Sequence, residues 1–138
     1  NRVRMIVASF LVKHLRIHWM EGEKHFKNCL VDYNEASNVA QWQWVAGCGA
    51  DAAPYFRIFN PILQGEKFDK DGIYTKKWVP ELINMPNKFL YKPWELEKKY
   101  QEQVKVIIGT DYPGPMVDHA TARNAALEAF QKIKKSIP

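Results

Sequence analysis

The sequence has little of what is typical of secreted or membrane-spanning proteins. Its 138 residues include two cysteines, Cys29 and Cys48, which form no CxxC motif. Two cysteines exclude a disulfide scaffold, although they permit one isolated disulfide. Buried free thiols in a reducing compartment are the favoured interpretation, and with them a cytoplasmic location. The longest predominantly apolar run, Met5 to Val12, is far shorter than the ~20 residues that cross a bilayer, and no signal peptide is evident.

The sequence also lacks the motifs of common enzyme classes. No glycine-rich phosphate loop is present, and no Ser/His/Asp or Cys/His combination indicates a nucleophilic hydrolase. His14 and His18 have the spacing to share a helix face and bind a metal, but no HExxH motif or carboxylate accompanies them. The stretch Asp69-Lys70-Asp71-Gly72 is similar to the start of a calcium loop, but no glutamate closes it at the required position. The sequence therefore predicts no metal site.

What the sequence does have is an excess of aromatic and basic side chains. It contains five Trp, six Tyr and seven Phe, and its 20 Lys and Arg against 15 Asp and Glu give a net charge of +5. Residues 1–31 concentrate the positive charge, which attracts phosphate backbones through counterion release. A solvated basic surface and an aromatic core explain the same composition. The composition therefore permits a nucleic-acid partner without establishing one.

The apolar pattern predicts one all-α domain with a long irregular middle. A helix is expected over 3–20, which has no glycine or proline and carries apolar residues at helical spacing. A shorter helix over 23–31 leads to a turn, Asp32-Tyr33-Asn34, whose side chains can cap a helix over 35–46 that ends at Gly47. The other expected elements are a loop over 47–72, helices over 73–79, 94–104 and 118–135, and a strand or buried loop over 106–108.

The expected helix over 35–46 carries the stretch Asn38-Val39-Ala40-Gln41-Trp42-Gln43-Trp44. Asn38 and Trp42 are four residues apart and share a helix face, whereas Trp44 points elsewhere. From the pattern alone, Trp42 is a core residue and Trp44 is a surface ring or one that faces a partner.

Several blocks of sequence follow one another in a familiar order. They are Asn1-Arg2-Val3-Arg4-Met5, Ala8-Ser9-Phe10-Leu11-Val12-Lys13, Trp42-Gln43-Trp44, Asp51-Ala52-Ala53-Pro54-Tyr55-Phe56-Arg57-Ile58-Phe59-Asn60-Pro61, Gln64-Gly65-Glu66-Lys67-Phe68-Asp69 and Trp78-Val79-Pro80-Glu81-Leu82, followed by Tyr112-Pro113. In this order they resemble class I DNA photolyases acting on cyclobutane pyrimidine dimers, within the photolyase/cryptochrome family. The match is close over residues 1–82 and looser over 83–138.

The resemblance implies that residues 1–138 form the C-terminal part of the helical FAD-binding domain, all-α with long irregular loops. It also implies that an α/β antenna domain, which holds the antenna chromophore, and the first half of the helical domain precede this chain. The chain starts at an asparagine directly in a helical pattern, which favours the same interpretation. We expect such a fragment to bind FAD weakly or not at all, and to need the remainder of the photolyase chain as its partner.

The resemblance assigns two residues to electron transfer and one to the flavin ring. Asn38 corresponds to the asparagine beside the reactive flavin nitrogen, where a neutral amide can hydrogen-bond the reduced ring. Trp42 corresponds to the tryptophan nearest the flavin in the photoreduction chain, and Trp19 to the next relay.

Four further residues correspond to flavin contacts. Arg4 and Asp32 match an Arg–Asp pair next to the flavin, and we expect a buried pair in which each charge needs the other. Phe26 and Asn34 match further contacts, and Asn34 replaces the more usual aspartate.

The remaining residues correspond to DNA contacts. Asn1, Met5 and Trp44 match the pocket for the flipped-out lesion, and Arg2 and Arg57 match phosphate contacts. Photolyases take a base out of the stack at a cost of roughly a few kcal/mol, which damage reduces. Stacking on an aromatic ring such as Trp44 offsets about 1–3 kcal/mol of it.

The implied activity is light-driven repair of pyrimidine dimers in UV-damaged DNA by electron transfer from reduced FAD. One alternative is a cryptochrome-type flavin photoreceptor without repair activity, and another is a non-catalytic fragment or split subunit. Plant-type cryptochromes commonly have aspartate in place of Asn38, and many non-repair relatives have tyrosine in place of Trp44. Photolyases for the (6-4) photoproduct carry histidine in place of Asn1, so all three positions favour dimer repair.

Overall fold

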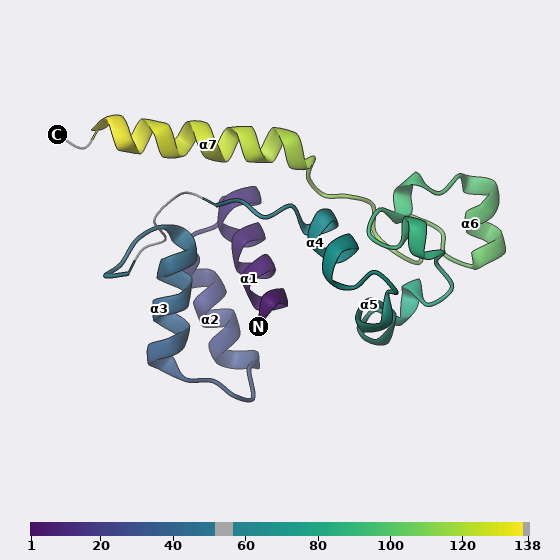
Figure 1. Ribbon diagram of the computed structural model, residues 1–138, viewed down its shortest axis with the longest axis horizontal. Helices are drawn as coiled ribbons and strands as arrows, with labels where there is room; N and C mark the ends of the chain where they lie inside the picture. Colours follow the sequence, from purple (N-terminus) through teal and green to yellow (C-terminus); the bar gives the residue numbers. More distant parts are fainter. Residues whose placement is uncertain (52–56, 137–138) are drawn as a thin grey trace. The chain divides into compact units, whose positions relative to one another are not determined.

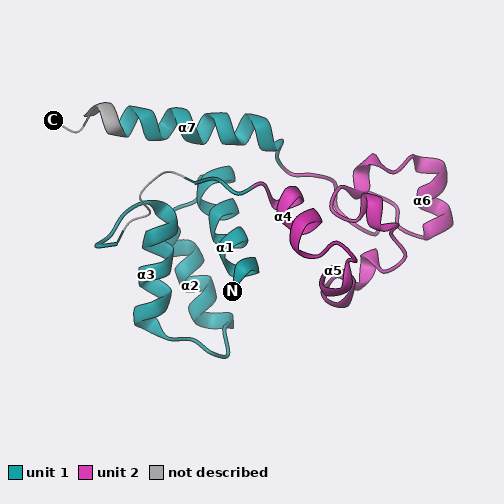
Figure 2. Cartoon of the chain, viewed as in Figure 1, with its two compact units in different colours: residues 1–59, 117–138 teal, residues 60–116 magenta. Residues whose placement is uncertain are grey.

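The computed structural model describes residues 1–51 and 57–136, with side chains up to residue 133. The regular structure within these residues is helical, apart from one isolated bridge between Ile108 and Tyr112. This confirms the expected all-α class. The chain divides into two compact units, residues 1–59 with 117–138 and residues 60–116 (Figure 2). Residues 52–56 of the longest sequence block lie outside the described residues.

The first unit contains α1 (Arg2–Ser9), the π-helical turn η1 (Phe10–His14), α2 (Trp19–Cys29) and α3 (Glu35–Ala46), which pack against one another (Figure 1). The prediction of one helix over 3–20 is wrong. The chain turns at Arg16, whose φ is 57°, and α2 begins after His18, whose ring nitrogen accepts a hydrogen bond from the Met20 amide. The apolar periodicity runs across the break because η1 and the start of α2 both pack on one hydrophobic cluster.

The helix α3 has the predicted bounds and the predicted ends. The Asn34 side-chain oxygen accepts from the Ser37 amide at 2.9 Å and caps the N-terminus. Gly47 ends the helix in the left-handed conformation, with φ 78°. Gly22 lies inside α2 and does not end a helix. A glycine is required at this position because the side chain of Trp42 occupies the space that a Cβ would need.

The helix α7 (His119–Ser136) completes the first unit by packing on η1. Its first turn is capped by Asp118, whose carboxylate accepts from the Thr121 amide at 2.8 Å. Arg57 and Phe59 are hydrogen-bonded to residues at the end of α1 and in η1. Lys13 donates its ammonium hydrogen to the Arg57 carbonyl, and Ser9 accepts from the Phe59 amide at 3.4 Å.

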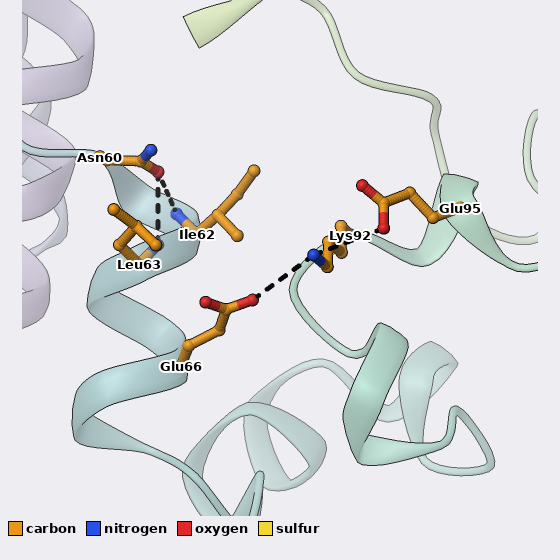
Figure 3. A network of polar contacts seen from close by, with 6 residues as sticks. All are labelled: Asn60, Ile62, Leu63, Glu66, Lys92 and Glu95. Atoms are coloured by element: carbon orange, nitrogen blue, oxygen red, sulfur yellow. Dashed lines mark hydrogen bonds and ion pairs between the residues drawn. The ribbon is translucent and has the colours of Figure 1, made fainter.

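The second unit contains α4 (Pro61–Phe68), α5 (Ile73–Trp78), α6 (Lys98–Val104) and three short 3-10 turns, Pro80–Leu82, Asn87–Phe89 and Pro93–Glu95. The expected loop over 47–72 is wrong where α4 lies. The Asn60 side chain caps the Ile62 and Leu63 amides at 3.0 and 3.3 Å, and Pro61 starts the helix. Lys92 lies between two carboxylates, 3.8 Å from Glu66 and 3.4 Å from Glu95 (Figure 3).

The core of the second unit consists of Leu82, Met85, Leu90, Leu96 and Val106. The expected helix over 94–104 is interrupted, because Leu96 adopts an extended conformation to enter this core. Val106 is fully buried in a loop, which is one of the two forms expected for residues 106–108.

Two further expectations concern the cysteines and the membrane. Cys29 and Cys48 are free, but both are exposed, so the prediction of buried thiols is wrong. Cys29 is the last residue of α2, and Cys48 follows the glycine that ends α3, so neither faces a core. No helix among the described residues is long and apolar enough to cross a bilayer.

Candidate functional site

A cavity of about 380 Å³ opens in the first unit, along α1, α2 and α3. Its wall combines aromatic and aliphatic side chains with a few amides and one ion pair. The lining residues are Asn1, Arg4, Met5, Ala8, Phe26, Leu30, Asp32, Asn34, Ser37, Asn38, Gln41, Trp42 and Val45. The volume lies in the range of cofactor and small-ligand sites, and polar and apolar side chains both contribute to the wall.

The aromatic part of the wall is formed by Phe26 on α2 and Trp42 on α3. Their rings meet edge to face, with centroids 5.1 Å apart and planes at 73°. Trp42 is 2% exposed and packs with Ala8 and Val45, so its indole is held firmly. This approach depends on Gly22, since a Cβ there would stand 2.1 Å from the Trp42 ring. A rigid aromatic corner of this kind suits a flat ring system.

The amide of Asn38 stands one turn before Trp42 on the same face of α3, as the i,i+4 spacing predicts. The side chain is 8% exposed. Its Nδ2 donates to the backbone carbonyl of Glu23 and to the Glu23 carboxylate, each at 3.0 Å. The amide nitrogen is therefore engaged by α2, and the carbonyl oxygen is the group that a ligand can use.

The ion pair of the cavity joins α1 to the turn after α2. Arg4 donates from Nη2 to both carboxylate oxygens of Asp32, at 2.8 and 3.0 Å. The hydrogen bond from Arg4 lowers the pKa of Asp32 below its ordinary value, so the pair stays charged. The pairing is confirmed, but the expectation of a buried pair is wrong here, because the side chains are 45% and 59% exposed.

A model of the family described as the FAD binding domain of DNA photolyase matches residues 1–132. The chain belongs to this family. Photolyase relatives match almost the whole of it. A deoxyribodipyrimidine photo-lyase of Agrobacterium fabrum is 58% identical over 136 residues, which are 99% of this chain and 28% of the relative. The chain thus spans little more than a quarter of that relative's length.

Two solved structures extend the comparison. A class III photolyase from Agrobacterium tumefaciens superposes with a TM-score of 0.92 at 58% identity, covering 99% of this chain and 28% of that one. A cryptochrome from Synechocystis superposes with a TM-score of 0.86 at 41% identity, covering 93% and 26%. A class III photolyase and a cryptochrome therefore both contain this helical arrangement.

The cavity fits the ring end of a flavin. Phe26 and Trp42 offer flat apolar surface, Asn38 offers an acceptor oxygen, and the Arg4–Asp32 pair offers charges at the rim. An isoalloxazine ring could use such a wall, because it is flat and carries hydrogen-bonding nitrogens and oxygens at its edge.

The structure brings most of the predicted residues to this one cavity. All five residues expected to contact the cofactor line it, together with Trp42, Asn1 and Met5. Trp19 and Trp44 do not line it, but both are half-buried against the cluster around Trp42. Arg2 and Arg57 are exposed outside it. The roles assigned to these residues by resemblance stay predictions.

Sequence reasoning missed Glu23, Gly22, Ser37 and Gln41. Ser37 and Gln41 directly precede Asn38 and Trp42, and Gln41 lies three residues after Asn38 and four after Ser37, so helical spacing could have found them. Nothing in the sequence indicates that Glu23 would reach Asn38, since that contact depends on how α2 packs on α3.

The weaker motifs prove structural. His14 is buried against His119, and His18 caps α2, so the two histidines do not converge. Asp69 caps α5 through the Tyr74 and Thr75 amides and accepts from the Tyr91 hydroxyl. Burial alone would raise the pKa of Asp69, but these hydrogen bonds outweigh it and lower the pKa to about 2. Among the described residues no three His, Cys, Asp or Glu side chains group as metal ligands.

Proposed function

We propose that this chain contributes the ring-binding part of the flavin site to a cyclobutane pyrimidine dimer photolyase, which repairs UV-damaged DNA under light. The observation that carries the proposal is the convergence of Phe26, Asn38 and Trp42 with the Arg4–Asp32 pair on one cavity. Because the chain spans about a quarter of its relatives, the activity belongs to a longer protein in which the remaining chain completes the FAD site.

In this proposal FAD supplies the photochemistry, as the light-absorbing electron donor to the dimer. The protein's residues hold it in place and protect it. Phe26 and Trp42 exclude water from the ring, and Asn38 accepts a hydrogen bond from it. Trp42 and Trp19 share one hydrophobic cluster, which supports a route for electrons between the cavity and the start of α2.

Exposure and charge support the DNA-binding roles that the resemblance implies. Asn1 and Met5 lie at the N-terminal end of α1 on the cavity wall, where a flipped-out dimer could approach the flavin. Trp44 has a partly exposed ring for stacking, and Arg2 and Arg57 are exposed cations for phosphates.

Two choices remain within the family: class I or class III, and a repair enzyme or a photoreceptor without repair activity. Asn1, Asn38 and Trp44 favour dimer repair over the (6-4) and cryptochrome alternatives. The sequence blocks favour class I within the photolyases, whereas the similarity to a class III photolyase favours class III, and the similarity to a cryptochrome supports a photoreceptor. A repair assay separates repair from sensing directly.

The experiment is to replace the matching quarter of the Agrobacterium fabrum photo-lyase with residues 1–138 and to purify the flavin-loaded chimera. DNA that contains thymine dimers is illuminated with it, and released thymine monomers are counted. We expect repair in the light and none in the dark. A parallel substrate with (6-4) photoproducts should stay unrepaired.

Two controls accompany this chimera. One is a second chimera that carries Trp44→Ala, and the other is the unmodified Agrobacterium fabrum photo-lyase. A chimera that folds, holds FAD and releases no monomers would contradict dimer repair and favour the photoreceptor. A chimera that folds without FAD would contradict the cofactor site itself.

A further inference from the structure

Glu23 supplies a hydrogen-bond acceptor for both hydrogens of the Asn38 side-chain nitrogen. An asparagine side chain has two N–H donors on nitrogen and one carbonyl oxygen. Here the nitrogen has two acceptors on one residue, the Glu23 backbone carbonyl and the Glu23 carboxylate, each 3.0 Å away. Two hydrogens and two acceptors match one to one. The nitrogen is thereby fully engaged with α2.

This arrangement allows only one orientation of the amide. A side-chain amide can rotate by half a turn at little steric cost, which exchanges its oxygen and nitrogen. At Asn38 that rotation would point the amide oxygen at two oxygens of Glu23. It would break two hydrogen bonds, one of them to a carboxylate, inside a buried contact where unmade bonds are costly.

We infer that Glu23 is a positioning residue that locks the Asn38 amide with its oxygen as the group available to the cavity. Glu23 does not line the cavity, so it acts through Asn38 rather than on a ligand. The inference deepens the proposed function and rests on it where the flavin is concerned. An oxygen held in this way accepts from a ring nitrogen that carries a hydrogen and repels a bare lone pair.

The consequence is selectivity for the protonation state of the cofactor. A reduced flavin carries a hydrogen on the ring nitrogen that an oxidised flavin leaves bare. With Glu23 in place the cavity favours the reduced, protonated ring. Without the carboxylate, one Asn38 hydrogen loses its acceptor and the amide gains freedom to turn over and to donate instead.

The test compares two variants that remove the same charge. Glu23→Gln keeps a side-chain oxygen that can accept from Asn38, whereas Glu23→Ala does not. Glu21→Ala removes a charge from the same helix at an exposed residue outside the cavity and serves as the matched control.

The first measurement needs no flavin. Nitrogen-15 NMR of the 138-residue chain follows hydrogen exchange of the two Asn38 side-chain hydrogens. One hydrogen bond of about 1 kcal/mol protects a hydrogen roughly five- to tenfold. We expect Glu23→Ala to lose that protection for one hydrogen, and Glu23→Gln and Glu21→Ala to keep it.

The second measurement uses the flavin-loaded holoenzyme. The ratio of the affinities for reduced and oxidised FAD, obtained from the reduction potential of bound flavin, should fall about tenfold in Glu23→Ala. Glu23→Gln should restore it toward the wild-type ratio.

Unchanged Asn38 protection in Glu23→Ala would overturn the inference, and so would equal shifts of the potential in the Ala and Gln variants. A wild-type holoenzyme that fails to hold flavin would contradict the proposed function instead, while the flavin-free NMR result would still decide the orientation of Asn38.

Discussion

At the scale of single residues, the site depends on close contacts between side chains of neighbouring helices. Trp42 is nearly fully buried, touches Phe26, and is approached by the Gly22 backbone. The i,i+4 spacing predicts from sequence that Asn38 and Trp42 share a face. The partners on α2 could not be predicted in this way, because they depend on the packing of two helices.

The contact at Gly22 gives a mutational prediction. In Gly22→Ala the new methyl group would meet the Trp42 ring 2.1 to 2.6 Å away, and an indole held in a core cannot give way easily. We expect a loss of about 1–3 kcal/mol in the free energy of unfolding. Urea denaturation measures it. Away from such a contact, replacing glycine by alanine inside a helix stabilises the helix by about 0.5–1 kcal/mol. An unchanged or higher free energy of unfolding in Gly22→Ala would therefore contradict the close approach.

Trp44 gives a prediction about DNA. Its ring is half-buried at the edge of the cluster and lies outside the cavity wall. If it stacks on the lesion, Trp44→Ala should weaken binding of dimer-containing DNA by about 1–3 kcal/mol and of undamaged DNA much less. Paired titrations of the flavin-loaded chimera with the two DNAs measure the difference. Equal losses for both DNAs would contradict a role in the lesion pocket.

At the scale of elements, α7 is attached to η1 by a pair of histidines. The Nε2 of His14 lies 2.8 Å from the Nδ1 of His119, and the His14 ring stacks on Phe10 at 4.9 Å. This contact joins residues 105 positions apart, so no local pattern could reveal it. Sequence spacing paired His14 with His18 instead, and the turn at Arg16 explains why that pairing fails. Helix ends were more predictable, since Asn34 and Gly47 act through local hydrogen bonds and backbone conformation.

The histidine pair gives a pH prediction. Burial, and after it the charge of His119, lowers the pKa of His14 below its ordinary value, so the folded state holds the ring neutral. The unfolded chain then binds more protons in the mildly acidic range. The stability from this contact is complete above the unfolded pKa of about 6.5 and is lost as the pH falls below it. Urea denaturation at pH 7.5 and 5.5 should show a lower free energy of unfolding at the acidic pH.

The matched variants for this prediction are His14→Asn, at the buried pair, and His18→Asn, at an exposed helix cap. We expect His14→Asn to flatten the difference between the two pH values and His18→Asn to keep it. If the wild type and both variants show the same difference in the free energy of unfolding between pH 7.5 and 5.5, the pH dependence belongs to groups other than His14.

At the scale of the whole molecule, the chain carries a cavity in its first unit, for which we propose the flavin ring, and a second unit with its own core. The all-α class and the family were predictable from sequence, because the blocks that carry them are contiguous. The helix α4 was not, since the many glycines and prolines of its neighbourhood favoured a loop. There Asn60 and Pro61 initiate a helix, and Gly65 fits within it against the Tyr91 ring.

The size of the chain relative to its relatives gives a further prediction. Because residues 1–138 span 28% of the Agrobacterium fabrum photo-lyase, contacts to the rest of FAD are expected from elsewhere. We expect the 138-residue chain by itself to bind FAD weakly or not at all, whereas we expect the chimera to bind one FAD per protein molecule. Absorbance of the flavin after gel filtration measures both. Stoichiometric yellow flavin on the isolated chain would contradict this expectation.

The roles assigned to the cavity residues depend on the cavity between α1, α2 and α3 holding the flavin ring. The most direct measurement is a crystal structure of the FAD-loaded chimera. The account predicts the ring against Phe26 and Trp42, with the Asn38 oxygen within hydrogen-bonding distance of a ring nitrogen and the Arg4–Asp32 pair beside it. A flavin ring bound elsewhere, with this cavity filled by water, would contradict it.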